Sequence, residues 1–138
     1  MKKLKIFING LGRIGRAFIR KNINNNNFEI IGVNDPKISS KNLEYLLEFD
    51  STYGKSNQKI KSISEDKISL NNKKIKITNE NELKNVNFKA DILLDCSGVT
   101  DTMHLRSLLT AGKKRAKYTI VTNDINDFQP IIADVNNN

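Results

Sequence analysis

Cysteine and histidine are almost absent from this sequence, and each absence excludes a class of protein. Its 138 residues contain one cysteine, Cys96, and one histidine, His104. A single thiol forms no internal disulfide and builds no cysteine-based metal site, so a disulfide-stabilised scaffold is excluded and no metal site is expected. No apolar run approaches the roughly 20 residues of a membrane-spanning helix, and the run Ile6–Ile8 after the basic N-terminus is too short for a secretory signal. We therefore expect a cytoplasmic protein without a membrane partner.

The remaining composition is that of an ordinary globular domain with a basic surface. Hydrophobic residues make up 38% and charged residues 28% of the chain, which is long enough for one domain with a real core. The formal net charge is +8, and 18 of the 23 basic residues are lysines spread along the sequence. Scattered lysines usually form a solvated surface, so nucleic-acid binding is the less favoured interpretation.

Apolar segments and turn residues alternate in an order typical of βαβ proteins. Short apolar runs predict strands at residues 4–8, 28–33, 90–95, 118–122 and 131–133. Helical spacing and capping residues predict helices at residues 14–22, from Ser39 or Ser40 through Leu47, and from Asp101 or Thr102 to a stop at Gly112. Residues 59–77 change to period-two alternation, with Asn71-Asn72 as a hairpin turn.

This order of elements predicts the fold class. Strands that alternate with helices favour an α/β protein with a doubly wound, mostly parallel sheet of the Rossmann type, here with a small antiparallel insertion around residues 59–77. In the first helix one face carries apolar side chains at helical spacing, and we expect it to meet the core: Ile14, Ala17, Phe18 and Ile19.

Three glycines follow the first predicted strand in the pattern G-x-G-x-x-G. Gly10 allows a tight turn, Gly12 lets the backbone approach a pyrophosphate, and Gly15 lets the helix pack against the strand. Alone this pattern is weak, because glycines in a loop often mean only a turn. Here it follows a strand and opens a helix inside a βαβ unit, so helix amide groups and the helix dipole favour a bound diphosphate. Arg13 adds positive charge at the same place.

Asp35 completes the pattern. It lies 20 residues after Gly15, at the end of the second predicted strand, which is the place of a carboxylate that accepts hydrogen bonds from an adenine ribose. A carboxylate there repels a 2′-phosphate and favours NAD over NADP. The simpler alternative is that Asp35 only starts the turn Asn34-Asp35-Pro36. With the glycines, helix and strand in order, dinucleotide binding is the favoured interpretation.

Several longer stretches resemble the phosphorylating glyceraldehyde-3-phosphate dehydrogenases. Residues 8–16 (INGLGRIGR) are similar to the family's opening, and residues 33–36 (VNDP) to the end of its second strand. The resemblance continues through residues 49–54 (FDSTYG), 71–75 (NNKKI), 95–98 (DCSG) and 112–115 (GKKR), so that it covers essentially the whole chain. The erythrose-4-phosphate dehydrogenases share the first two motifs, which leaves the substrate open between the two.

The resemblance implies a set of cofactor contacts. By this likeness the pyrophosphate is lined by the glycine turn, Asp35 holds the adenine ribose, and Ser97, Gly98 and Thr122 border the cleft near later strand ends. An arginine that borders the adenine in the family is replaced near Asn81. The cofactor is expected to be NAD, and the residues expected to contact it are Asn9, Gly10, Gly12, Arg13, Ile14, Asp35, Ser97, Gly98 and Thr122.

The resemblance also implies what this chain does not contain. The family's catalytic cysteine lies in a Ser-Cys-Thr-Thr-Asn motif, which is absent here along with its base histidine and phosphate-binding residues. We expect residues 1–138 to form one NAD(P)-binding domain without the C-terminal catalytic domain and without dehydrogenase activity of its own. The family's last helix, which packs on this domain, is missing too, so an apolar groove is expected to be open to a complementing chain or a homo-oligomer.

Three features invite a catalytic or binding interpretation. Cys96 follows the apolar pair Leu93-Leu94 and is expected to be a small buried side chain rather than a nucleophile. His104 is expected to be solvated on a helix surface. The cluster Lys113, Lys114, Arg115 and Lys117 suits either a phosphate or RNA contact or, more simply, a solvated helix end. No catalytic residue is assigned. A non-catalytic NAD- or RNA-binding module stays as the alternative function.

Overall fold

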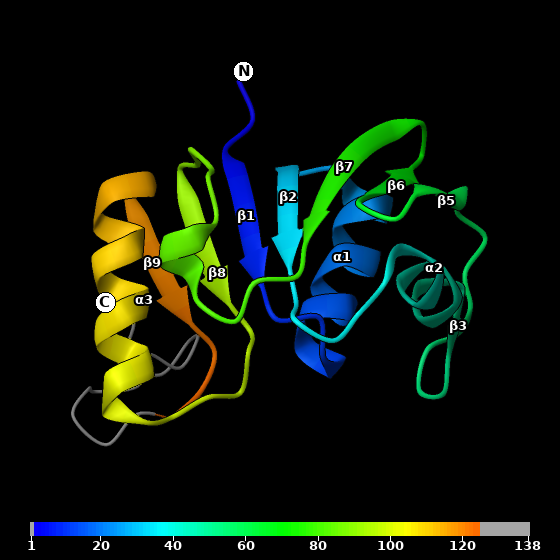
Figure 1. Ribbon diagram of the computed structural model, residues 1–138. Helices are drawn as coiled ribbons and strands as arrows, with labels where there is room; N and C mark the ends of the chain where they lie inside the picture. The colour runs from blue at the N-terminus through cyan, green and yellow to red at the C-terminus, as the bar shows by residue number, and fades with distance from the viewer. Residues whose placement is uncertain (1, 125–138) are drawn as a thin grey trace, which may run out of the picture.

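A seven-stranded sheet with helices on both faces forms the centre of the molecule (Figure 1). The computed structural model describes residues 2–124. The helices are α1 (Arg13–Asn25), α2 (Ser40–Glu48), α3 (Thr102–Arg115) and the short 3₁₀ turn η1 (Leu83–Asn85). The strands are β1 (Lys5–Asn9), β2 (Glu29–Asn34), β3 (Phe49–Asp50), β4 (Gly54–Lys55), β5 (Ile60–Ser64), β6 (Lys67–Leu70), β7 (Lys73–Thr78), β8 (Ile92–Asp95) and β9 (Tyr118–Val121).

The strand order confirms the doubly wound architecture. Across the sheet the strands run β5-β6-β7-β2-β1-β8-β9, and the five from β7 to β9 are parallel. The chain starts at β1, moves outward through β2 in one direction, and later returns to place β8 on the other side of β1. The winding therefore reverses between β1 and β8, and ligands of such sheets bind outside the carboxyl ends of the strands at this reversal.

The antiparallel insertion is present, and it is joined to the main sheet. β5, β6 and β7 pair antiparallel to one another, but β7 also pairs in parallel with β2. The turn between β6 and β7 is the predicted Asn71-Asn72 pair, whose φ angles of 48° and 67° are both positive. Positive φ at both central residues is typical of the tight hairpin turn that matches strand twist.

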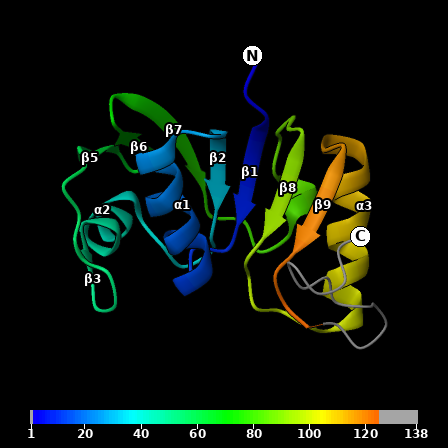
Figure 2. The same ribbon diagram turned by 180° about the vertical axis from the view of Figure 1, so that it is seen from behind.

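Two apolar cores lie on the two faces of the sheet. One core lies under α1 and α2 and is built on strand residues such as Ile8, Val33 and Leu94. The other lies under α3 and η1, where Phe7 and Leu93 meet Leu108. Figure 2 shows α1 and α3 over different parts of the sheet. Alternate residues of β1 and β8 thus serve opposite cores, as expected for strands buried on both faces.

The structure corrects three details of the predicted elements. Gly112 does not end the third helix, which continues to Arg115, because a Cβ at Gly112 would come within 2.3 Å of the Thr119 hydroxyl and the glycine instead allows α3 to approach β9 closely. Ile14 is 53% exposed at the start of α1 and does not join the core. The antiparallel pairing of β3 with β4 after α2 was not among the predicted elements. The strand predicted at residues 131–133 lies outside the described residues.

Within residues 2–124, β9 is an edge strand of the sheet, and two of its apolar side chains are exposed. Val121 contributes to the core beneath α3, whereas Tyr118 and Ile120, which alternate with it, are 66% and 47% exposed. Alternation places these two side chains on the face opposite α3. Within residues 2–124, no helix is both long enough and apolar enough to cross a bilayer.

Candidate cofactor site

The first glycine turn is held tightly against the neighbouring strand end. Gly10 has φ of 91°, and a Cβ there would come within 2.5 Å of the backbone of Cys96 and Ser97. A Cβ at Gly15 would lie 2.2 Å from the carbonyl oxygen of Gly10. Both positions therefore need glycine so that β1, α1 and the end of β8 can pack together, as the sequence pattern predicts.

Gly12 is different, because nothing fills the space beside it. A Cβ built at Gly12 would find no atom within 4 Å. Gly12 is also the N-cap of α1, and no side chain accepts a hydrogen bond from the helix start. The amide groups of the first helical turn have no partners inside the helix. The turn thus presents free N–H donors to an open space at the carboxyl end of β1.

The charges around this helix start are those expected for an anion site. The first turn of α1 contains no acidic residue. Arg13 and Arg16 lie there instead, although cations are unfavourable at the positive end of a helix dipole. Arg16 donates to the carbonyl oxygen of Leu11 at 2.9 Å, which fixes one arginine against the turn. A bound anion would compensate both the dipole and the two arginines.

Asp35 lies at the mouth of the glycine turn. Its Oδ2 accepts a hydrogen bond from the Leu11 amide at 2.9 Å, and its Oδ1 accepts one from the Lys37 amide at 2.9 Å. Asn79 donates to the Asp35 carbonyl oxygen at 2.7 Å and holds its loop. The carboxylate is half-buried and keeps lone pairs free for further donors. The predicted pairing of the turn with this acidic residue is therefore present in the structure.

A chain of buried polar side chains crosses the sheet beneath this site, and the sequence analysis missed most of it. Asn9 Nδ2 donates to Asp95 Oδ1 at 2.7 Å, and Asn34 Nδ2 donates to Asn9 Oδ1 at 2.9 Å. Thr78 Oγ1 donates to Asn34 Oδ1 at 2.8 Å. These side chains belong to the last residues of β1, β8, β2 and β7, four parallel strands whose carboxyl ends lie at the same edge of the sheet. The sequence feature that could have predicted this network is the polar residue at the end of each apolar strand.

Ser97 and His104 continue this chain toward the surface. Ser97 Oγ donates to Asp95 Oδ2 at 3.1 Å and lies 3.3 Å from His104 Nε2. His104 is half-buried, in the first turn of α3, rather than fully solvated as expected. Gly98 follows with φ of 77° and is exposed. The predicted pair Ser97 and Gly98 therefore lies at the end of β8, beside the glycine turn.

Thr122 and Cys96 lie side by side below the same edge. Thr122 Oγ1 donates to the Asp95 carbonyl oxygen at 3.0 Å, so its hydroxyl is engaged with β8. Burial raises the pKa of the Cys96 thiol to about 11, and the nearby Asp95 charge acts in the same direction. A buried thiol with a raised pKa is a poor nucleophile, as the sequence analysis expected.

A small cavity opens between η1 and α3. Its volume is about 350 Å³, and Asn81, Met103 and His104 are among the residues that line it. Asn81 is exposed, and its short amide stands where the resemblance implies an arginine in the family.

Comparison with known proteins decides the family. The family described as "Glyceraldehyde 3-phosphate dehydrogenase, NAD binding domain" matches residues 4–103, which include β1, the glycine turn, Asp35 and the end of β8. The chain belongs to the glyceraldehyde-3-phosphate dehydrogenase family. Its cofactor is NAD, the ligand of the family's matched domain.

Relatives in this family are much longer than the chain. Glyceraldehyde-3-phosphate dehydrogenase 1 of Trichormus variabilis is 36% identical over 99% of this chain and 40% of its own length. The chloroplastic enzyme GAPCP1 of Arabidopsis thaliana is 30% identical over 98% of this chain and 35% of its own length. Glyceraldehyde-3-phosphate dehydrogenase of Colletotrichum gloeosporioides is 37% identical over 83% of this chain and 35% of its own length. The chain thus spans about two fifths or less of these relatives.

The residues present fit the family's cofactor. A dinucleotide needs donors for its diphosphate and an acceptor for its ribose hydroxyls. The open space at Gly12 and the uncapped start of α1 meet the first need, and the half-buried carboxylate of Asp35 meets the second. One predicted contact residue is engaged elsewhere: Asn9 is 5% exposed and both ends of its amide contact neighbouring strands.

Proposed function

We propose that this chain binds NAD in the crevice between the carboxyl ends of β1 and β8, as the nucleotide domain of a glyceraldehyde-3-phosphate dehydrogenase. The observation that carries the proposal is the open space beside Gly12 at the uncapped start of α1. In this assignment the diphosphate lies on the amide groups at Gly12, Arg13 and Ile14. When bound, NAD supplies the hydride acceptor, and this chain supplies its position.

The remaining predicted residues divide into contacts and supports. Asp35 accepts hydrogen bonds from the adenine-ribose hydroxyls, and its charge opposes a 2′-phosphate. Ser97 and Gly98 border the crevice from β8. Gly10 and Asn9 act as positioning residues, because Gly10 is packed against Cys96 and Ser97 and the Asn9 amide joins three strands. Thr122 borders the crevice from the end of β9 while its hydroxyl remains on Asp95.

We propose further that the isolated chain oxidises no aldehyde. Oxidation of an aldehyde through a cysteine thioester needs a thiolate nucleophile with a nearby base. The single thiol, Cys96, is buried and has a pKa of about 11. The single imidazole, His104, contacts Ser97. The names of the relatives point to glyceraldehyde 3-phosphate as the substrate of the whole enzyme, to which this domain would present NAD.

Titration with NADH tests the proposal. We expect saturable binding by the purified chain, detected by calorimetry or by nicotinamide fluorescence. Gly12→Val fills the open space and should weaken binding by about tenfold or more, since the diphosphate loses its closest approach to the helix start. The matched control is Lys21→Val, an exposed position on the same helix. It should bind like the parent chain.

Two results would contradict the proposal. One is unchanged NADH affinity in a Gly12→Val variant whose circular dichroism matches that of the parent. The other is NADH production from glyceraldehyde 3-phosphate, NAD and phosphate by the purified chain, which would place the chemistry on residues assigned here to structure.

We propose also that the exposed apolar pair on β9 is an assembly surface. Tyr118 and Ile120 lie together on the exposed face of β9, where another polypeptide segment would bury them. A second copy of the chain is the occupant we propose for the purified protein. Sedimentation at increasing concentration should show a dimer that Ile120→Lys abolishes, and a concentration-independent monomer would contradict the proposed dimer.

We propose also that the protein works in the cytoplasm, because a single buried thiol suits a reducing compartment.

A further inference from the structure

A second concave site lies at the opposite edge of the sheet from the cofactor crevice. It has a volume of about 670 Å³. Three segments line it: the N-terminal residues before and within β1, the residues that precede β8, and the junction between α3 and β9. Figure 1 shows that the N-terminus and the end of α3 lie toward the same edge of the sheet. We propose that this hollow, called here the basic groove, binds linear oligophosphates such as tripolyphosphate.

The charge of the basic groove carries the proposal. Among the described residues, its lining includes a single carboxylate, Asp91, and seven cationic side chains: Lys2, Lys3, Lys5, Lys89, Lys114, Arg115 and Lys117. Asp91 is already engaged, because its Oδ1 lies 2.9 Å from Lys117 Nζ and its Oδ2 accepts from the Lys5 amide at 2.9 Å. Within residues 2–124, none of the other groove lysines has a carboxylate within ion-pair distance. Concave walls that carry one sign of charge concentrate the field and attract counter-ions.

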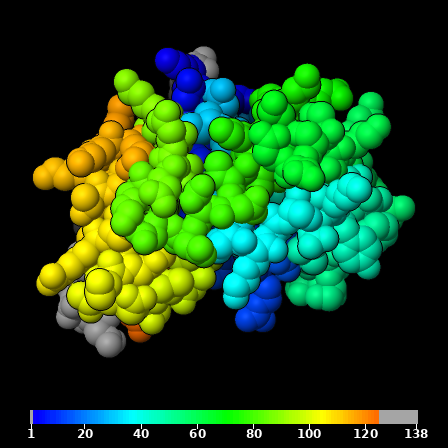
Figure 3. All heavy atoms as spheres, in the orientation of Figure 1, coloured from blue at the N-terminus to red at the C-terminus, as the bar shows by residue number. Residues whose placement is uncertain are grey.

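Folding alone does not account for this gathering of cations. Lys114 and Arg115 occupy the last turn of α3, where cations complement the helix dipole. That reason does not apply to Lys2, Lys3 and Lys89, which lie on no helix and come from two other parts of the chain. Figure 3 shows one face of the molecule with the N-terminal segment at the same edge as the segment that precedes β8. Like charges brought together this way destabilise the fold unless an anion binds between them.

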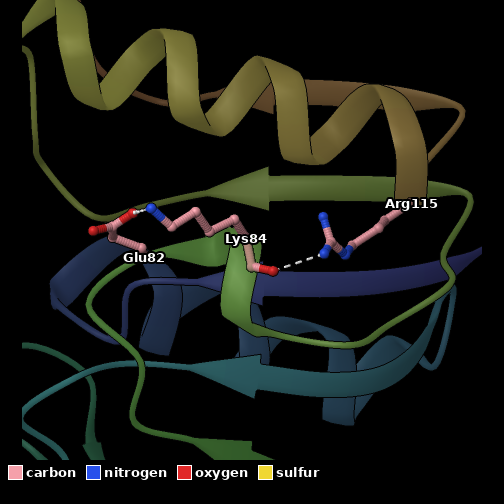
Figure 4. Close-up of polar contacts among 3 residues, drawn as sticks. All are labelled: Glu82, Lys84 and Arg115. Carbon is pink, nitrogen blue, oxygen red and sulfur yellow. Dashed lines mark hydrogen bonds and ion pairs between the residues drawn. The ribbon is translucent and has the colours of Figure 1, made fainter.

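One wall of the basic groove is fixed by contacts outside it. Arg115 donates to the Lys84 carbonyl oxygen at 2.8 Å (Figure 4). Its guanidinium also lies 6.0 Å from the centre of the Phe88 ring. The ammonium of Lys84 is paired with Glu82 and does not line the groove. The Arg115 side chain is therefore anchored, while the groove lysines other than Lys117 carry point charges on flexible stems that adapt to phosphate oxygens.

The lining selects a phosphate chain rather than a nucleic acid. Single-stranded nucleic-acid sites combine a basic surface with aromatic side chains on which bases stack. No aromatic residue of the part of the chain that the structure describes lines the basic groove. A linear oligophosphate offers dense negative charge without bases, which matches a site made of lysines, one anchored arginine and aliphatic walls.

The proposal does not depend on the proposed function, because the two sites are separated by the length of the strands. β1 has five residues and extends about 16 Å from the basic groove to the glycine turn. Oligophosphate binding should therefore persist when NADH saturates the cofactor crevice, and loss of NADH binding should leave it unchanged.

Calorimetric titration of the full chain with tripolyphosphate tests the inference. The groove variant replaces Lys2, Lys3, Lys89 and Lys114 with glutamine, and leaves the Asp91 pair intact. The control variant replaces four exposed lysines outside the groove with glutamine: Lys21, Lys41, Lys61 and Lys74. Its net charge therefore equals that of the groove variant. We expect the groove variant to bind about tenfold more weakly than the control variant at low salt, and binding by the parent to weaken at high salt.

Each alternative outcome overturns the inference. Equal loss in the two variants would show a general effect of net charge. Absence of tripolyphosphate binding by the parent chain would remove the site. Tighter binding of a single-stranded oligonucleotide than of a polyphosphate of equal charge would assign the groove to nucleic acid. Displacement of tripolyphosphate by NADH would place it in the cofactor crevice.

Discussion

Asp35 is a single residue that shapes the glycine turn and, in our proposal, also selects the cofactor. Its carboxylate accepts from the Leu11 amide and so sets the shape of the glycine turn. We predict that Asp35→Asn weakens NADH binding by about tenfold, because a hydrogen bond to a charged acceptor is lost. The variant should also reduce discrimination against NADPH, since its amide no longer repels a 2′-phosphate. Fluorescence titration with both cofactors measures the ratio.

Asparagine is chosen at this position because its side-chain oxygen can still accept from Leu11, although its NH2 group cannot accept from the Lys37 amide. The melting temperature of Asp35→Asn should therefore fall only by the loss of that one exposed hydrogen bond. Asp66→Asn, an exposed position on the insertion, serves as the control and should change neither affinity. An unchanged NADH to NADPH ratio in Asp35→Asn would show that Asp35 only shapes the turn.

Cys96 gives the second prediction for a single residue. Burial raises the pKa of its thiol to about 11, so almost no thiolate forms near neutral pH. We predict that iodoacetamide leaves the folded chain unmodified at pH 8 and alkylates Cys96 fully in denaturant, as measured by intact mass. Between the unfolded pKa near 9.0 and the folded value, only the unfolded state loses the proton, so stability falls as pH rises. Rapid alkylation of the folded chain would contradict this assignment.

The ends of four strands act together as one element, held by the buried polar chain. Asp95 is 0% exposed, and the Asn9 amide is one of its side-chain donors. We predict that Asn9→Leu lowers the free energy of unfolding by about 1–3 kcal/mol, because it leaves buried acceptors without donors. Urea unfolding measures the loss. Asn87→Leu, at an exposed asparagine, should cost much less, and an equal loss in the two variants would mean that the network contributes little.

Elements were predictable wherever local pattern and three-dimensional context agree. The alternation of apolar runs with helical spacing was enough to predict the doubly wound sheet, and the hairpin at Asn71-Asn72 followed from turn chemistry alone. The helix end predicted at Gly112 was wrong, because the glycine's helix-breaking tendency of about 1 kcal/mol is outweighed by close packing of α3 on Thr119. The prediction for Ile14 was wrong too, since helical spacing does not reveal that a side chain in the first turn stays exposed.

The candidate site was predictable in its backbone part and less so in its side chains. The glycine pattern and Asp35 have fixed spacing within one βαβ unit, so the sequence predicted their approach. The contacts between Asn34, Asn9 and Asp95 depend on which strands are neighbours in the sheet. That order is set by winding in two directions from β1, and no local pattern encodes it. The contact of His104 with Ser97 has a different cause: it depends on the path of the loop between β8 and α3, which local pattern does not encode either.

The whole molecule has a strong positive charge, with a formal net charge of +8. This charge makes its few well-placed carboxylates important for stability. The pKa of Asp91 is lowered by hydrogen bonds from Lys117 and from the Lys5 amide. Hydrogen bonds from the Tyr53 and Thr52 amides lower the pKa of Asp50, and one from the Ser64 hydroxyl lowers the pKa of Asp66. Each carboxylate therefore favours the folded state in its ionised form.

These lowered pKa values set the direction of acid unfolding. Their stabilisation is complete above the unfolded value of 3.8 and is lost as pH falls through the lower folded values, because the unfolded chain then binds more protons. We predict cooperative unfolding below pH 4, followed by circular dichroism, with added salt shifting the midpoint to lower pH by screening the net positive charge. A variant with asparagine at Asp50, Asp66 and Asp91 should be less stable at pH 7 and should lose less further stability in acid. An acid transition of the same steepness in this variant would assign the pH dependence to other carboxylates.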